Sequence, residues 1–198
     1  INQPKQSHDD KGFLLKKWVT SFDAISDLGT PSKSGISRYS KKPDCEYQKI
    51  MRTDINKISS THHYTPYASE KDKEIIKYVK PGGNYSDIPD EVATNRILYF
   101  KKTGGRTTTY GRLNPEKPNY TINTYFDRPN IGCNIHYKYN RMITIREGLR
   151  FQSFNDDFQL YSSGKRNFYV QVGNAVPPLV SKAWAEEIKR VFLKSKIM

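Results

Sequence analysis

Apolar residues recur at helical spacing in four stretches of the chain. The first two begin at Thr20 and Ser69, each with an aspartate three residues later, an arrangement that caps the start of a helix. The third follows the T-x-x-E box of Thr144, and the fourth opens at Pro178, because proline suits the first helical position. The spacing therefore predicts helices over 20–28, over 69–79, from 144 onward and over 178–193.

A different pattern begins after residue 96. Runs of apolar and β-prone residues at 97–100, 107–113 and 120–126 predict strands, with a basic turn at 101–106. Interleaved Arg, Thr and Tyr side chains in such a hairpin suit the major groove of DNA, where Arg pairs with guanine and Thr meets the thymine methyl group. The alternative is an edge hairpin that its lysines keep soluble.

Two shorter signals complete the pattern. Pro89 predicts a short helix through Ala93. Residues 169–172 alternate as a strand does, and the turn residues Gly173 and Asn174 separate this strand from the last helix. Helices and strands together predict a mixed α/β (α+β) fold.

The charge of the chain narrows its class of partner. Its 198 residues include 33 Lys and Arg against 20 Asp and Glu, which gives a net charge of +13. A chain this basic usually faces a polyanion. Because 13% of the residues are aromatic, with 14 Tyr, we favour nucleic acid over a merely solvated basic surface.

The sequence contains no signal for a metal site, a disulfide framework or a membrane span. Cys45 and Cys133 form no C-x-x-C pair, and the adjacent His62 and His63 point in different directions on either a helix or a strand. No run is apolar enough for a membrane span, and no signal peptide is visible, so we expect a reducing, intracellular compartment. Ile1 in place of Met indicates either a removed tag or leader or a piece of a longer chain.

Two motifs near the C-terminus carry a resemblance. The stretch R-M-I-T-I-R-E-G-L-R-F-Q-S-F at 141–154 and the stretch Q-V-G-N-A-V-P-P at 171–178 resemble the last two ordered motifs of DNA cytosine-5 methyltransferases. They are in the family's order and about its distance apart. One departure is Asn155, where the family often has a proline.

Two further segments resemble the same family. The phrase W-V-T-S-F-D-A-I-S-D-L-G at 18–29 is similar to the link that follows the family's catalytic domain, with Gly29 in place of a proline. The stretch from Tyr110 to Thr124 is similar to its target-recognition region, and His136 also has a counterpart in many members. The resemblance implies a linker and short helix at 1–40, a target-recognition region at 41–140 and a C-terminal motif helix, strand-turn and closing helix at 141–198.

The family's catalytic motifs have no counterpart in this chain. Neither cysteine follows a proline, no E-N-V stretch is present, and no F-x-G-x-G loop follows a strand. Acidic neighbours Asp44 and Glu46 would raise the pKa of the Cys45 thiol. We therefore expect no catalytic residue here, and an isolated chain without methyl-transfer activity.

The resemblance implies roles for particular residues. Asn174 and Ala175 would complete the site of the methyl donor S-adenosylmethionine, which the missing catalytic part would mainly bind. Arg146 and Arg150, four apart on the motif helix, form a basic ridge that would hold the recognition lobe or contact phosphates. The predicted DNA-binding residues are Arg106, Tyr110, Arg112, Thr121, Arg146 and Arg150.

The resemblance also implies partners and a setting. The partners would be double-stranded DNA and a catalytic domain or subunit of the same methyltransferase, in a restriction-modification system of a prokaryotic cytoplasm, on the nucleoid when bound to DNA. The apolar stripe of the last helix, which includes Trp184 and Ile188, would then lack its partner when the catalytic part is absent. The alternative is a DNA-binding module without chemistry. An RNA-binding protein is a weaker third hypothesis, since it leaves the motifs unexplained.

Overall fold

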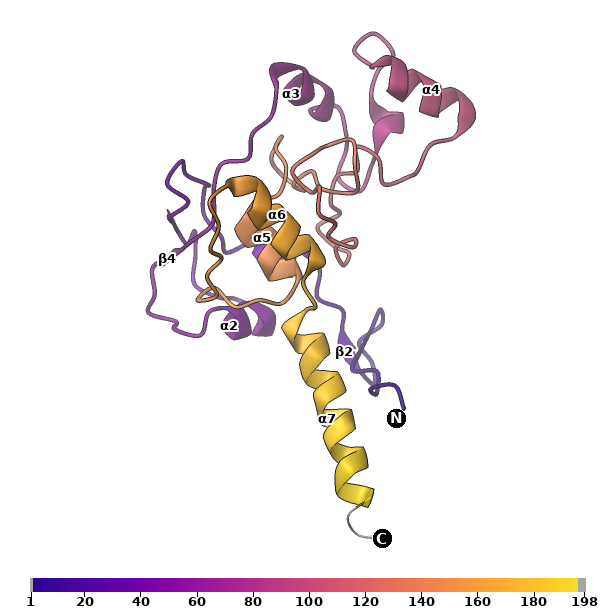
Figure 1. The fold of residues 1–198 in the computed structure, drawn as a ribbon. Helices are drawn as coiled ribbons and strands as arrows, with labels where there is room; N and C mark the ends of the chain where they lie inside the picture. The colour runs from indigo at the N-terminus through magenta and orange to yellow at the C-terminus, as the bar shows by residue number, and fades with distance from the viewer. Residues whose placement is uncertain (1, 196–198) are drawn as a thin grey trace.

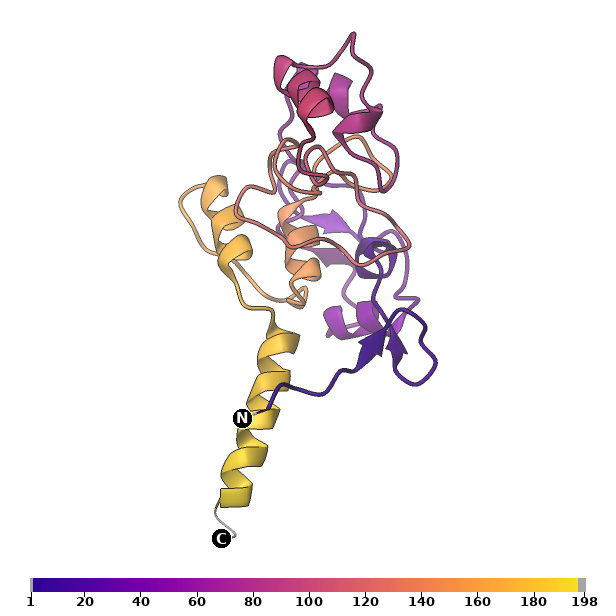
Figure 2. The same cartoon turned by 90° about the vertical axis from the view of Figure 1, so that its right-hand side faces the viewer.

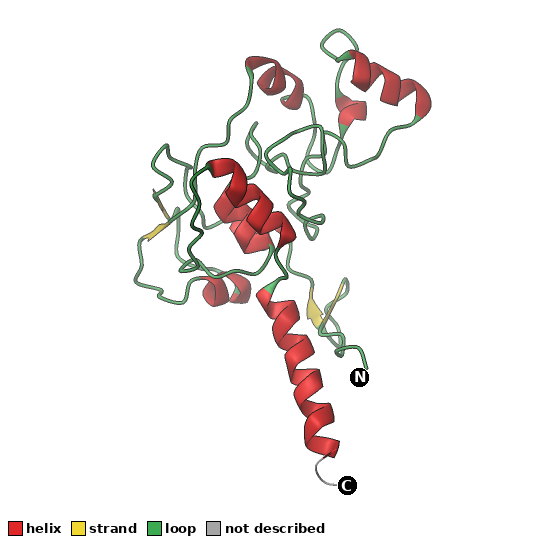
Figure 3. Ribbon diagram, viewed as in Figure 1, coloured by secondary structure: helices red, strands yellow, loops and turns green. Residues whose placement is uncertain are grey.

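The computed structural model describes residues 2–195, with side chains as far as residue 193. Most of the chain is loop, which links short helices and four two-residue strands (Figure 3). The helices are α1 Ser21–Ile25, α2 Glu46–Met51, α3 Glu70–Ile76, η1 Tyr85–Asp87, α4 Asn95–Thr103, α5 Ile145–Phe151, α6 Lys165–Asn174 and α7 Pro178–Ser195. The strands are β1 His8–Asp9, β2 Lys16–Lys17, β3 Ser37–Arg38 and β4 Ser59–Ser60.

The strands form two small sheets. β1 pairs with β2 in parallel, with His8 opposite Lys16, and β3 pairs with β4 antiparallel, with Ser37 opposite Ser60. The predicted mixed α/β class is therefore present, although the strands are short and the helices dominate (Figure 3).

The four helices predicted from capping and spacing are present. Thr20 and Thr144 both form complete capping boxes, and the Ser69 hydroxyl accepts a hydrogen bond from the Asp72 amide. The first two helices are shorter than predicted: α1 ends at Ile25 and α3 ends at Ile76. The last helix, α7, begins at Pro178 as predicted.

The predicted strand hairpin is wrong. Residues 95–103 form helix α4, because the Thr94 hydroxyl caps it and Ile97 and Phe100, three apart, pack on one face. Residues 107–113 and 120–126 are turns and extended loops. Within the described residues, Arg112 instead forms an isolated parallel bridge with Ile135, which lies outside the predicted strands. The helix predicted at Pro89 is a turn.

Helix α5 lies at the centre of the fold. The α5–α6 cluster packs around it with ten buried apolar residues: Leu113, Ile122, Phe126, Ile143, Ile145, Leu149, Leu160, Phe168, Tyr169 and Val172. The α3–α4 cluster above it contains nine: Ile75, Ile76, Val79, Tyr85, Ile88, Ile97, Tyr110, Ile135 and Met142. A third, small cluster on α1 contains Ala24, Ile25 and Leu28. Because every residue from Ile145 to Arg150 is buried, each charge on α5 needs a partner.

The two ends of the molecule differ. Helices α3 and α4 lie at one end, while α7 projects from the other as a long helix beyond the body (Figures 1 and 2). Trp184 and Ile188 on α7 are 40% and 38% exposed. None of the helices within residues 2–195 combines the length and apolar character that a bilayer crossing requires.

Candidate functional site

The first motif folds into one hydrogen-bonded unit at the start of α5. The Glu147 carboxylate accepts from the Thr144 amide at 2.7 Å and from both terminal nitrogens of Arg141 at 2.8 and 2.7 Å. Burial alone would raise the pKa of Glu147, but attraction to Arg141 and its hydrogen bonds outweigh burial and lower it. Burial lowers the pKa of His136, 3.6 Å from this carboxylate, to about 4, so this imidazole is neutral at pH 7.

Arg146 joins two distant segments. Its guanidinium donates to the carbonyl and hydroxyl oxygens of Thr61 at 2.8 and 3.1 Å, and to the carbonyls of Asn155 and Phe158, both at 3.0 Å. The side chain is 0% exposed. Asn155, at the family's usual proline position, therefore contributes a backbone oxygen to the motif helix.

Arg150 is the second buried guanidinium of α5. It donates to Asp156 at 2.7 Å from two nitrogens, to Asp27 at 3.0 and 3.2 Å, and to the Ala24 carbonyl at 2.9 Å. The predicted basic ridge of Arg146 and Arg150 lies inside the fold, because both side chains are 0% exposed and face protein oxygens. This burial favours the predicted role of holding the recognition lobe over the predicted phosphate contact.

Arg112 and Tyr110 are also inside the fold. Arg112 is 3% exposed and Tyr110 is 6% exposed, and Tyr110 belongs to the α3–α4 cluster. Arg112 donates to five oxygen acceptors at 2.6–3.0 Å, which belong to Ile76, Val79, His136, Tyr139 and Asn140. These two residues therefore support the region from within, in contrast to the predicted direct contact with DNA. Arg106 and Thr121 are exposed, so for them the prediction of a DNA contact remains.

In the second motif, the predicted strand at 169–172 is wrong. These residues belong to helix α6, because Phe168, Tyr169 and Val172 form one apolar face that packs in the α5–α6 cluster. The motif glycine lies where this helix crosses the backbone of residues 123–124. A Cβ built on Gly173 would lie 2.5 Å from the Thr124 nitrogen. The glycine therefore permits close packing of a helix on a loop.

Gly173→Ala is expected to lower the free energy of unfolding by about 1–3 kcal/mol or more, because backbone atoms that cannot rotate away would oppose the new methyl group. Urea denaturation followed by far-UV circular dichroism measures this. The matched control is Gly164→Ala at the other end of α6, where a Cβ meets nothing within 4 Å. An equal loss of stability in the two variants would contradict the explanation.

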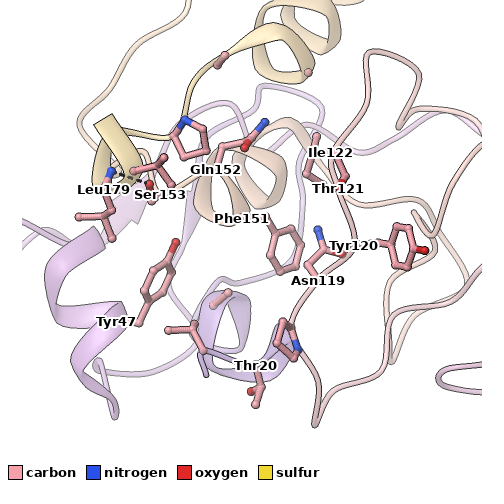
Figure 4. A pocket seen from close by; sticks show the side chains of 17 residues that line it. Thr20, Tyr47, Asn119, Tyr120, Thr121, Ile122, Phe151, Gln152, Ser153 and Leu179 are labelled. Carbon is pink, nitrogen blue, oxygen red and sulfur yellow. Dashed lines mark hydrogen bonds between the residues drawn. The ribbon is translucent and has the colours of Figure 1, made fainter. Parts of the chain in front are cut away.

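A hollow of about 610 Å³ opens where α6 meets α7 (Figure 4). Its walls come from five parts of the chain. They comprise Val19, Thr20, Ala24, Tyr47, Pro118, Asn119, Tyr120, Thr121, Ile122, Phe151, Gln152, Ser153, Gly173, Ala175, Pro177, Leu179 and Val180. The Ser153 hydroxyl accepts from the Leu179 amide at 3.1 Å and ties the start of α7 to the end of α5 (Figure 4). The hollow thus brings the second motif beside the exposed Thr121.

Residues of the second motif line part of the hollow. Ala175 and Gly173 line it, and Asn174 between them is exposed. Both side-chain polar atoms of Asn119, which also lines the hollow, are buried without a hydrogen bond to any described residue. Among the side chains described up to residue 193, no charged one lines the hollow. The donor S-adenosylmethionine carries an ammonium, a sulfonium and ribose hydroxyls, so carboxylates that hold these groups would have to come from elsewhere.

Burial raises the pKa of both cysteine thiols. The pKa of the Cys133 thiol rises to about 11. A thiol is a nucleophile only when it is deprotonated. Within residues 2–195, no three His, Cys, Asp or Glu side chains gather closely enough to hold a metal ion.

Sequence reasoning missed several residues that build this site. Helix α2, which contributes Tyr47 to the hollow, has no clear periodicity in the sequence. Asp27 and Asp156, the partners of Arg150, lie 123 and 6 residues from it. An arginine at a helical position of an otherwise apolar stripe is a signal that could have predicted buried carboxylate partners.

Comparison with known proteins now identifies the family. The model of the C-5 cytosine-specific DNA methylases matches residues 5–190. Type II methyltransferase M.AgeI of Thalassovita gelatinovora is 28% identical over 242 residues, which cover 95% of this chain and 54% of that protein. Type II methyltransferase M.Eco47II of Escherichia coli is 29% identical over 182 residues, which cover 91% of this chain and 38% of that protein.

A plant protein and a solved structure extend the likeness. DNA (cytosine-5)-methyltransferase 4 of Arabidopsis thaliana is 30% identical over 225 residues, which cover all of this chain and 14% of that protein. A crystal structure of a DNA modification methyltransferase encoded within a prophage (E. coli) shares the fold, with a TM-score of 0.58 at 19% identity. The superposed region covers 88% of this chain and 48% of the prophage-encoded chain.

The fold and motifs thus define a DNA methyltransferase class. This chain belongs to the C-5 cytosine-specific DNA methylase family. Members of the family use S-adenosylmethionine and act on DNA. The chain spans about half of the length of M.AgeI and less of the other curated relatives named above.

Proposed function

We propose that this chain is the DNA-recognition and C-terminal part of a DNA (cytosine-5-)-methyltransferase. The whole enzyme would transfer a methyl group from S-adenosylmethionine to C5 of cytosine at a specific duplex site, in a restriction-modification system. One observation carries the proposal: the chain has both C-terminal motifs in a folded arrangement, yet its sequence contains no Pro-Cys pair and no Gly-rich donor loop. Its length of about half of M.AgeI supports the same division.

Within this proposal the domains take the predicted roles. Residues 1–40 would link to the catalytic part, residues 41–140 would recognise DNA, and residues 141–198 would support both. The exposed Arg106 and Thr121 would contact DNA directly. The buried Arg112, Arg146 and Arg150 would act indirectly, because they hold the segments on which such contacts depend.

Methyl transfer would need further groups that a partner supplies. In a duplex the target cytosine must leave the stack before a thiolate can add to C6, after which C5 takes the methyl group and later loses its proton. S-adenosylmethionine supplies that methyl group when bound. Asn174 and Ala175 would form one wall of its site and exclude water from it, next to the hollow. The thiolate and the carboxylates would come from a catalytic domain or subunit of the same methyltransferase.

The exposed apolar residues of α7 fit this division. Leu179, Val180 and Trp184 are 41%, 49% and 40% exposed on a helix that projects from the body (Figure 2). A helix with exposed residues of this kind usually packs against another surface. The catalytic part would cover it. The setting we propose is the cytoplasm of a prokaryotic cell, where the enzyme would meet the nucleoid.

Two measurements on the isolated chain test the proposal. Incubation with labelled S-adenosylmethionine and genomic DNA of mixed sequence is expected to transfer no methyl groups above background, because the chain has no activated thiol. Fluorescence anisotropy with a mixed-sequence duplex is expected to show binding that weakens as salt rises. Turnover by the pure chain, or absence of DNA binding at low salt, would contradict the proposal.

A further inference from the structure

Helix α4 and the turn after it form a second feature that no motif explains. One side of the helix is buried through Ile97 and Phe100. The Lys101 ammonium donates to the Ile88 carbonyl and to the Asp90 carboxylate. The other side is exposed, and we call it the α4 face. It consists of Arg96, Tyr99, Lys102, Thr103 and Arg106. Helical spacing places Arg96, Tyr99 and Lys102 three apart along one side of the helix.

The charge of this segment has one sign. Residues 92–115 contain five Lys or Arg and no Asp or Glu. Two of the five serve the fold: Lys101 pairs with Asp90 at 2.5 Å, and Arg112 is buried among carbonyls. The other three are the exposed Arg96, Lys102 and Arg106, and Arg96 also lies 5.2 Å above the Phe100 ring.

Helix electrostatics do not account for these three cations. Cations stabilise the C-terminal turn of a helix, which suits Lys102. Arg96, however, lies in the first turn, where the helix dipole disfavours a positive charge. Arg106 lies beyond the end of the helix. A polyanion outside the chain would explain all three positions together.

The position of the α4 face leaves it accessible. Helix α4, which carries this face, lies at the end of the molecule opposite to α7 (Figure 1). A surface at that end can meet one partner while the hollow and α7 meet another. The exposed Tyr99, at 62%, adds a flat apolar ring among the cations.

We propose that the α4 face lies along the phosphate backbone of duplex DNA and supplies affinity that does not depend on sequence. The inference rests on the proposed function and names the surface that would bind the DNA backbone. Arg96 and Lys102 are about 9 Å apart along the helix axis, which spans roughly two or three phosphates of one strand. Tyr99 between them would pack on a sugar.

The test is a triple variant with Arg96→Ala, Lys102→Ala and Arg106→Ala. Anisotropy with a random-sequence duplex is expected to show at least about tenfold weaker binding near 0.1 M salt. The slope of log K against log salt is expected to become less negative by about 2.7, which corresponds to three lost phosphate contacts. Circular dichroism is expected to show unchanged helix content, since all three side chains are exposed.

A charge-matched control separates this surface from net charge. Lys42→Ala, Lys49→Ala and Lys182→Ala together remove the same charge from α7 and the α2 region, away from α4 (Figure 1). This control is expected to change the affinity less than threefold. Equal losses in the two triple variants would overturn the inference while the proposed function stands. A wild-type chain that binds no DNA would instead contradict the proposed function itself.

A second probe distinguishes DNA from other polyanions. Duplex RNA of the same sequence, at equal concentration, is expected to compete less well than duplex DNA for the wild-type chain. Equal competition, with the same loss in the α4 triple variant, would overturn the assignment to duplex DNA.

Discussion

Replacing Arg150 with Met is expected to lower the free energy of unfolding by about 3–5 kcal/mol, which for a chain of this size can abolish folding. The guanidinium is 0% exposed and lies between the carboxylates of Asp27 and Asp156, which are also buried. Removing the cation would leave both carboxylates in a low-dielectric interior. Among the residues that the structure describes, the positive groups paired with them would then be Arg52, 3.6 Å from Asp27, and Arg146, 3.9 Å from Asp156.

Urea denaturation measures this loss, and two further variants interpret it. Arg190→Ala on α7, which removes the surface ion pair of Arg190 with Glu187, is expected to lower stability far less than Arg150→Met does. Arg150→Met combined with Asp27→Asn and Asp156→Asn is expected to recover part of the lost stability, because neutral amides cost less to bury than carboxylates. A triple variant no more stable than Arg150→Met would show that packing, and not uncompensated charge, is responsible.

Replacing Arg112 with Met is expected to loosen the α3–α4 cluster while the rest of the chain stays folded. Five oxygen acceptors would lose the guanidinium of Arg112. The Ile76 and Tyr139 carbonyls would still accept from the Val79 and Arg141 amides, so the cost falls on the Val79 and His136 carbonyls and the Asn140 side chain. A buried acceptor without a donor costs about 1–3 kcal/mol. We therefore expect a loss of at least about 3 kcal/mol, concentrated in this cluster.

Hydrogen exchange measured by mass spectrometry tests whether the effect is local. Amides of α3 and of residues 135–142 are expected to exchange faster in Arg112→Met, whereas those of α5 and α6 keep their protection. The matched control is Arg96→Met, at an exposed arginine of helix α4. It is expected to leave amide exchange unchanged. Faster exchange throughout the chain would mean that the two clusters unfold as one unit.

Local signals in the sequence predicted those elements that depend on neighbouring residues. The capping boxes at Thr20 and Thr144 and the cap at Ser69 predicted where three helices begin, because a side chain satisfies an amide only three residues away. Helix ends were less accurate, as α1 and α3 show. Proline at the start of α7 acted in the same local way.

The failures have a common cause. Residues 97–100 and 169–172 contain β-prone aromatic and branched side chains, yet both segments are helical. Propensity differences amount to fractions of a kcal/mol per residue, so burial of Phe100 and Tyr169 against neighbouring helices outweighs them. A short apolar run does not reveal which surface it will meet.

The arginines show most clearly what the sequence determines and what the tertiary structure determines. From the sequence alone, the order of motifs indicated the family, and the net charge of +13 indicated a polyanionic partner. Sequence spacing could not distinguish an arginine that faces solvent from one that faces a carboxylate 123 residues away. Only the tertiary structure placed Arg112, Arg146 and Arg150 inside, because burial of a charge depends on partners that distant segments bring together. It left Arg96, Lys102 and Arg106 outside, free to meet a partner beyond the chain.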